Sequence, residues 1–108
     1  MKNIFIIYGH YNDKSFTCAI KDTFIKSAKQ KGHKIDIVDL YKDNFNPVFV
    51  GEKANDEIKN YQARIDKADV IVFMYPIWWF RAPAIVEGFI DRVFTPPWAF
   101  KFKKVIGY

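Results

Sequence analysis

Cysteine is nearly absent from this chain of 108 residues, which contains only Cys18. A single thiol cannot form an internal disulfide or a cysteine-cluster metal site, so nothing in the sequence calls for an oxidising compartment. Long hydrophobic runs are lacking as well. The apolar run at residues 4–8 is too short for the core of a signal peptide or for a membrane span. We therefore expect a cytoplasmic protein that does not insert into a membrane.

Glycine and proline are also scarce, with five residues each, and charge of one sign is limited to a net +5. The basic residues are scattered, except for a small group formed by Lys101, Lys103 and Lys104. Such a weak positive field suits a phosphate-bearing ligand, but it does not indicate a nucleic-acid-binding surface. The two histidines have no metal-ligand spacing. The composition is that of one globular domain over residues 1–108.

Aromatic residues are abundant, at 19% of the chain, and more than half of them lie in the last third. The run at residues 75–80, Tyr-Pro-Ile-Trp-Trp-Phe, is too bulky to be packed wholly inside a domain of this size. We expect a planar ligand against part of it. Coverage of a sheet, or a contact between subunits, would explain the same rings.

Hydrophobic patterning predicts strands that alternate with helices. Strands are expected at residues 4–8, 34–40, 70–75 and 104–108. Helices are expected from the cap Ser15 to the stop Gly32, over residues 55–68, and over residues 83–94. This alternation favours a parallel, doubly wound α/β sheet with helices on both faces. Ligands of such sheets bind beyond the carboxyl ends of the strands, which directs attention to loops 9–15, 40–47 and 76–83.

The first of these loops has residues that could hold a phosphate. A helix N-terminus offers unpaired N–H groups, and His10, Ser15 and Thr17 add an imidazole and two hydroxyls. Neither a dinucleotide fingerprint nor a P-loop is present. An ordinary helix cap at Ser15 and a solvated His10 explain the same residues, and Cys18 is expected to be a small buried residue on the sheet face.

The loop at residues 76–83 places large rings between two prolines at the predicted ligand edge. Flat ligands such as flavins are held by main-chain N–H groups that meet the ring heteroatoms and by aromatic walls that exclude water. This loop is therefore the more specific of the two candidate sites.

Three groups of residues carry a resemblance to a known family. They are residues 6–10 with 15–16, residues 39–41 with 45–47, and residues 75–80 continuing through 83–85 and 88–94. The chain resembles the first part of the flavodoxin-like NAD(P)H:quinone reductases, and it is also similar to the ancillary oxidoreductases of potassium-efflux systems. The resemblance implies a three-layer flavodoxin-like fold with strand order 2-1-3-4-(5).

By this resemblance, the chain binds FAD, with FMN as the alternative, and uses NAD(P)H as cosubstrate. The implied cofactor-binding residues are His10, Ser15, Phe16, Thr17, Pro76, Ile77, Trp78, Trp79 and Phe80. Ala99, Phe100 and Lys101 would line the pocket for the nicotinamide or the quinone. The implied reaction is a ping-pong cycle, in which a hydride reaches flavin N5 and a quinone-like acceptor then receives two electrons. The helix at residues 83–94 would pack near the two-fold axis of a homodimer.

One departure from the family concerns the C-terminus. The family continues past the fourth strand into a Thr-Thr-Gly-Gly loop, a Tyr and a His that assist hydride transfer, a fifth strand and a final helix, whereas this sequence ends at Tyr108. No catalytic residue is therefore assigned, and weak or absent turnover is expected. The alternative is a non-catalytic, truncated homologue that acts as a dimerisation or interaction module, for example beside a potassium-efflux system. A receiver-type signalling domain is disfavoured, because Tyr8, Gly9 and His10 stand where its Mg²⁺ would need carboxylates.

Overall fold

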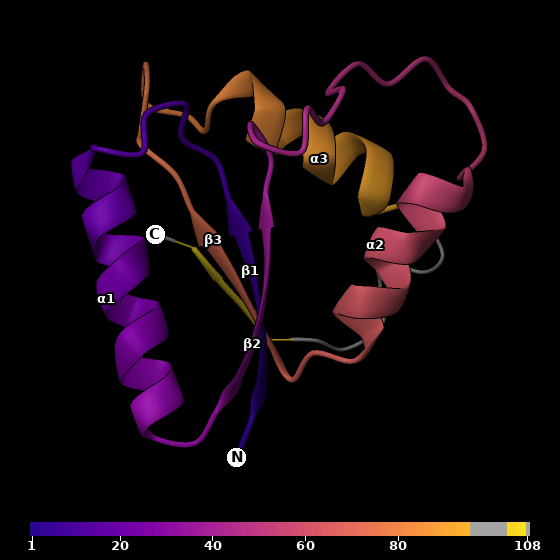
Figure 1. The fold of residues 1–108 in the computed structure, drawn as a ribbon. Coiled ribbons are helices and arrows are strands. Elements are labelled where there is room, and N and C mark those ends of the chain that lie inside the picture. The colour runs from indigo at the N-terminus through magenta and orange to yellow at the C-terminus, as the bar shows by residue number, and fades with distance from the viewer. Residues whose placement is uncertain (96–103, 108) are drawn as a thin grey trace.

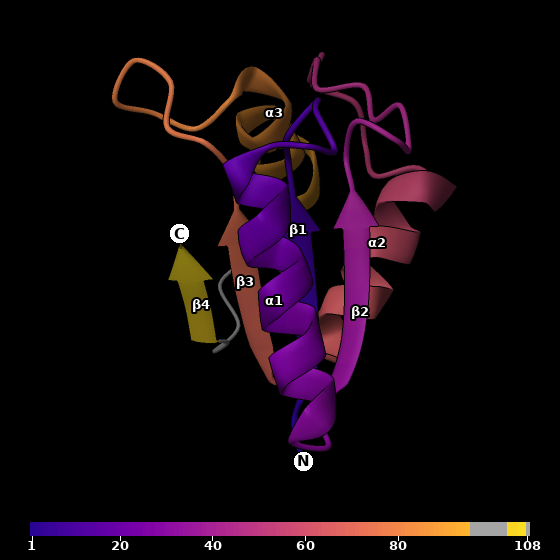
Figure 2. The same ribbon diagram turned by 60° about the vertical axis from the view of Figure 1, so that its left-hand side comes forward.

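The fold is an alternating α/β sheet, seen in a computed structural model that describes residues 1–95 and 104–107. Its elements are β1 (Asn3–Tyr8), α1 (Phe16–Gln30), β2 (Lys34–Asp39), α2 (Asp56–Asp66), β3 (Val70–Met74), α3 (Ala84–Val93) and β4 (Lys104–Gly107). Every strand pair is parallel and the order is β2-β1-β3-β4 (Figure 2). The predicted alternation and strand order are confirmed, and the element ends differ from the prediction by one or two residues.

The sheet lies between two helical layers (Figure 1). Helix α1 covers one face, and α2 and α3 cover the other. Strand β1 is buried on both faces because its side chains alternate: Phe5 and Ile7 pack with the α2 and α3 layer, while Ile4 and Ile6 pack under α1. A continuous apolar run in the sequence thus becomes the central strand.

Local signals begin and end the helices as expected. The Ser15 hydroxyl accepts a hydrogen bond from the N–H of Cys18 at 3.0 Å, which caps α1. The chain leaves α1 through Gly32, whose φ of 83° suits glycine. Asn55 caps α2 in the same manner, accepting from the N–H of Ile58 at 2.9 Å.

The loop between β2 and α2 is fastened to α3 by a buried arginine. Arg92 is only 8% exposed and donates to the carbonyl oxygen of Asn46 at 2.6 Å and to Glu52 Oε1 at 3.2 Å. The N–H groups of Glu52 itself and of Val50 hold the pKa of the Glu52 carboxyl below its usual value, and Arg92 adds to this effect. The loop is thereby held against the helix that follows β3.

The same loop passes so close to α3 that only glycine fits at position 88. A Cβ atom on Gly88 would overlap the Cβ, Cα and carbonyl oxygen of Pro47. Because two of these three atoms belong to the main chain, the overlap could be relieved only by moving the loop or the helix.

We predict that Gly88→Ala lowers the free energy of unfolding by about 1–3 kcal/mol, because the Pro47 backbone must shift. Urea unfolding of the purified protein measures this loss. Asp91→Ala, at an exposed position on the same helix, is the matched control and should stay within about 0.5 kcal/mol of the wild type. Equal midpoints for the two variants would contradict the close approach.

Candidate functional site

Three loops meet at the carboxyl ends of β1, β2 and β3, at the upper edge of the sheet in Figure 1. An aromatic cluster, consisting of His10, Tyr11, Tyr41 and Trp78, joins them. Tyr11 stacks on His10 with a centroid distance of 4.8 Å, and it lies 6.3 Å from Tyr41 and 6.0 Å from Trp78. His10 and Trp78 are 6.2 Å apart. The structure thus brings together residues of the two loops that the sequence singled out.

Sequence reasoning missed two members of the aromatic cluster, Tyr11 and Tyr41. Both could have been found from position alone, because Tyr11 lies in the loop after β1 and Tyr41 follows β2 by two residues. Loops that follow parallel strands form the ligand-binding edge of the sheet. An aromatic residue in such a loop is therefore a candidate ligand-binding residue, even where it belongs to no recognised motif.

The start of α1 keeps free hydrogen-bond donors. The Ser15 hydroxyl is used for capping, whereas the N–H groups of Phe16 and Thr17 donate to no other residue in the part of the chain that the structure describes. His10 Nδ1 accepts from the N–H of Asn12 at 2.9 Å, so the neutral ring carries its proton on Nε2. These three donors, at the positive end of the helix dipole, can bind an anion.

Below this turn lies a buried tyrosine with an unpartnered hydroxyl. Tyr8 is 2% exposed, and its hydroxyl has no hydrogen-bond partner within the described residues. Burial and the neighbouring Cys18 thiol raise the pKa of Tyr8 to about 12. The Lys21 ammonium group sits 4.7 Å from the centre of its ring. Cys18 is itself buried, as expected.

A pocket of about 370 Å³ opens beside Tyr8, between α1 and the ends of β1 and β2. His10, Tyr11 and Tyr41 of the aromatic cluster line it, together with Lys21 and Lys42. Two carboxylates, Asp13 and Asp39, line it as well. The site therefore combines aromatic walls with side chains of both charges, next to the free N–H donors of α1.

The loop after β3 lies at the same edge. Trp78 is 36% exposed, whereas Ile77 is 69%, Trp79 86% and Phe80 100% exposed. Phe16, on the first turn of α1, is also exposed. The predicted ring-binding residues are therefore available to a ligand. Ala99, Phe100 and Lys101, predicted to line the substrate pocket, lie outside the described residues.

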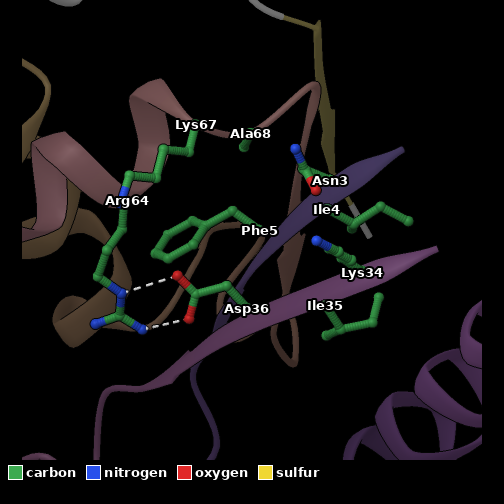
Figure 3. A pocket seen from close by; sticks show the side chains of 9 residues that line it. All are labelled: Asn3, Ile4, Phe5, Lys34, Ile35, Asp36, Arg64, Lys67 and Ala68. Atoms are coloured by element: carbon green, nitrogen blue, oxygen red, sulfur yellow. Dashed lines mark hydrogen bonds and ion pairs between the residues drawn. The ribbon is translucent and has the colours of Figure 1, made fainter. Parts of the chain in front are cut away.

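A cavity of about 520 Å³ opens at the opposite end of the strands, on the side of the sheet facing α2 (Figure 3). Two of the charged side chains that line it, Arg64 and Asp36, pair with each other. Arg64 binds Asp36 in two places, with Nε to Oδ2 at 2.9 Å and Nη2 to Oδ1 at 2.7 Å, and also donates to the carbonyl of Ile37. Asp36 raises the pKa of Arg64 above its usual value. This pair joins α2 to β2, and we place the candidate site at the other end.

His33 also lies at the end away from the candidate site, as expected. Its Nδ1 accepts from the N–H of Lys2 at 3.0 Å, beside the start of β1. Within the described ranges, no group of three or more His, Cys, Asp or Glu side chains could hold a metal ion. No helix among these residues is long and apolar enough to cross a membrane.

A parallel sheet of order β2-β1-β3-β4, with a donor-rich helix start and aromatic loops at its carboxyl edge, defines a doubly wound α/β protein with one ligand edge. A family model described as a flavodoxin-like fold matches residues 2–107. The chain belongs to this family, which confirms the predicted fold.

Curated relatives carry related names. The human ribosyldihydronicotinamide dehydrogenase [quinone] is 28% identical over a gapped alignment of 124 positions, which covers 92% of this chain and 54% of the relative. A Haemophilus influenzae protein named an uncharacterized NAD(P)H oxidoreductase is 35% identical over 108 residues, with 92% and 54% covered. The chain thus spans about half the length of the curated relatives it matches.

A solved structure agrees. The NAD(P)H:quinone oxidoreductase from Methanothermobacter marburgensis superposes with a TM-score of 0.80 at 28% identity, over 87% of this chain and 54% of that one. Together these similarities confirm the predicted resemblance to quinone reductases.

We predict that Tyr8→Phe leaves stability at neutral pH unchanged or raises it by up to about 1 kcal/mol, because it removes a buried hydroxyl that has no partner. The stabilities of the wild type and of Tyr8→Phe should differ more in alkaline solution. The folded pKa of about 12 lies above the ordinary value of 10.0, so the unfolded state ionises first and wild-type stability falls as pH rises through this range. Urea unfolding at about pH 8 and about pH 11 measures the difference. Parallel losses in the wild type and Tyr8→Phe would contradict this account.

Proposed function

We propose that residues 1–108 form a flavodoxin-like flavin-binding domain that belongs to an NAD(P)H:quinone oxidoreductase, or to one with another two-electron acceptor. The observation that carries the proposal is the aromatic cluster, which joins all three ligand-edge loops next to the free donors of α1. The names of the relatives support the reaction class.

The residues present fit a flavin. A flavin needs donors for its phosphate arm, and the N–H groups of Phe16 and Thr17 with Nε2 of His10 supply them. The isoalloxazine ring needs a flat apolar wall, which Trp78, Trp79 and Phe80 can provide from the loop after β3. Ser15 holds the α1 donors in place through its cap, and Pro76 and Ile77 lead the chain from β3 to the rings.

A bound flavin would supply hydride chemistry between NAD(P)H and a two-electron acceptor, and we propose that this proceeds through N5 in a ping-pong cycle. The chain's own residues bind, orient and shield the ring from water. We propose FAD rather than FMN, following the family resemblance. Ala99, Phe100 and Lys101 are proposed to line the nicotinamide and quinone pocket. No residue of this sequence is assigned a catalytic proton transfer.

We predict that the protein shifts the absorbance bands of added FAD or FMN at micromolar concentration, and that His10→Ala weakens this binding about tenfold through the loss of one charge-assisted hydrogen bond. His33→Ala is the matched control, because His33 lies at the opposite end of the sheet. The absence of any band shift with the wild type would sink the cofactor proposal. Equal affinities for the two histidine variants would remove His10 from the site.

We also propose that the chain forms a homodimer through α3. Val86, Phe89 and Val93 of this helix are buried in the core, whereas Ile90 is 40% exposed on its outer side. An exposed branched aliphatic side chain on the outer face of a helix whose inner face is buried suits a subunit contact.

We predict that Ile90→Glu shifts the protein from dimer to monomer in sedimentation experiments, because the carboxylate would be buried without a partner. Ile20→Glu is the control: Ile20 is 43% exposed, about as much as Ile90, but lies on α1 in the other helical layer. A monomeric wild type, or equal dissociation by both variants, would contradict a dimer through α3.

A non-catalytic interaction module is the second candidate. Exposed apolar side chains favour it, both Ile90 on α3 and Val48 and Val50 in the loop after β2. The two candidates differ in one observation: a dimeric wild type that binds neither FAD nor FMN would favour the module over the oxidoreductase.

A further inference from the structure

The pocket beside Tyr8 lies on the side of the sheet that α1 covers, at the carboxyl ends of β1 and β2. Its volume of about 370 Å³ is typical of a site for a small organic molecule. Two ammonium groups, those of Lys21 and Lys42, and two carboxylates, those of Asp13 and Asp39, line it. Because these charges balance, the pocket as a whole favours neither a simple anion nor a simple cation.

Tyr8 is the buried part of the pocket lining. The residue is 2% exposed, and its hydroxyl has no hydrogen-bond partner within the described residues. A buried hydroxyl without a partner costs free energy, so a ligand that supplies the missing partner gains affinity. The unpartnered hydroxyl therefore points to a ligand and not to an ordinary hollow of the surface.

Two opposite charges lie beside Tyr8 without meeting each other. The Lys21 ammonium group is 4.7 Å from the centre of the Tyr8 ring, and Asp39 is the partner of Tyr8 in the register of β1 and β2. Burial and the Cys18 thiol raise the pKa of Tyr8, and the charge of Asp39 adds to this rise. No ion pair joins Lys21 to Asp39 in the part of the chain that the structure describes. A ligand that carries both charges could bridge them.

Both charged groups keep hydrogen-bonding capacity for such a ligand. The Lys21 side chain is only 16% exposed, and Asp22, a largely exposed neighbour, takes one of its three donors at 3.3 Å. Asp39 Oδ1 accepts from the N–H of Lys42 at 3.3 Å, and Asp39 Oδ2 has no hydrogen bond to a described residue. Lys21 can therefore bind a carboxylate, and Asp39 can bind an ammonium group.

Aromatic side chains supply the apolar part of the pocket. The rings of Tyr11 and Tyr41 line it edge to face, with their centroids 6.3 Å apart. Tyr11 is 68% exposed, so its ring is available to cover a ligand. Such rings suit a ligand with an apolar body between its charged groups and the solvent.

We propose that this pocket is a second ligand site, which binds a small zwitterion with an apolar body, of the chemical class of the α-amino acids. Lys21 meets the carboxylate of the ligand, and Asp39 meets its ammonium group. The Tyr8 hydroxyl gains the partner that it lacks, and Tyr11 and Tyr41 contact the apolar body. The inference goes beyond the proposed function, because Tyr8, Lys21 and Asp39 are not among the residues proposed to hold the flavin.

Three probes with the same ring separate the two charges of the ligand. L-phenylalanine carries both charges, 3-phenylpropionate lacks the ammonium group, and 2-phenylethylamine lacks the carboxylate. We expect the full chain to bind L-phenylalanine about tenfold more tightly than either analogue in calorimetric titrations, because each analogue loses one charge-assisted hydrogen bond. The inference is overturned if either analogue binds as tightly as L-phenylalanine, or if L-phenylalanine does not bind at millimolar concentration.

Each charge of the pocket is tested with the probe that lacks its counterpart. In Lys21→Met, L-phenylalanine should bind no more tightly than 2-phenylethylamine, because its carboxylate has no ammonium group to meet. In Asp39→Asn, which keeps an acceptor for the N–H of Lys42, it should bind no more tightly than 3-phenylpropionate. Lys26→Met is the matched control, since Lys26 is exposed on α1 and does not line the pocket. A Lys21→Met protein that keeps the wild-type preference would contradict the inference.

Tyr8→Phe tests the hydroxyl without a loss of stability at neutral pH. We expect this variant to bind L-phenylalanine about fivefold more weakly than the wild type, because one hydrogen bond to the ligand is lost. An unchanged affinity would show that the hydroxyl meets no ligand and would count against the inference.

FAD titrations of the same proteins distinguish this inference from the proposed function. Lys21→Met and Asp39→Asn should bind FAD as the wild type does. A wild type that binds L-phenylalanine as described, but neither FAD nor FMN, would refute the proposed function and leave the second site standing. A wild type that binds FAD but not L-phenylalanine would overturn the second site alone.

Discussion

The burial of β1 on both faces is the constraint on which the rest of the structure depends. Phe5 and Ile7 on one side, and Ile4 and Ile6 on the other, require a helical layer over each face. The backbone of β1 also needs a neighbour along each side, which β2 and β3 provide in parallel. Parallel neighbours turn all their carboxyl ends to the same edge, so the loops after the three strands must meet there.

Because the three loops meet at one edge, they can be held by shared contacts. The loop after β2 is held by Arg92 and by the close passage of Pro47 over Gly88, and both contacts come from α3. Helix α3 in turn follows the aromatic loop after β3. One helix therefore positions the segments on both sides of the site, and the aromatic cluster closes the arrangement from Tyr41 to Trp78 through Tyr11.

Patterns that depend on near neighbours in the chain could be predicted. The cap at Ser15, the stop at Gly32 and the central strand each follow from a few adjacent residues, and the strand order from the alternation of elements. Contacts between distant segments could not be predicted. Arg92 donates to Asn46, which lies 46 positions earlier in the chain, and no local sequence pattern indicates this contact. The left-handed backbone of Trp79 and Phe80, with φ values of 54° and 62°, was hidden for a different reason, because backbone propensity argues against that conformation for large residues.

The two ends of the sheet differ in how many of their polar groups have a hydrogen-bond or ion-pair partner within the chain. At the amino end, Asp69 accepts from the N–H of Asn3 and donates its own N–H back to the Asn3 carbonyl, while Arg64 pairs with Asp36. At the carboxyl end, donors at the start of α1 have no partner among the described residues, and the loop after β3 holds the rings of Trp79 and Phe80 in solvent. Apolar rings held in water raise the free energy of the free protein, and main-chain donors without a protein partner are available to an anionic ligand. Their concentration at one end is the reason for proposing the ligand there, although a cavity of about 520 Å³ opens at the other end.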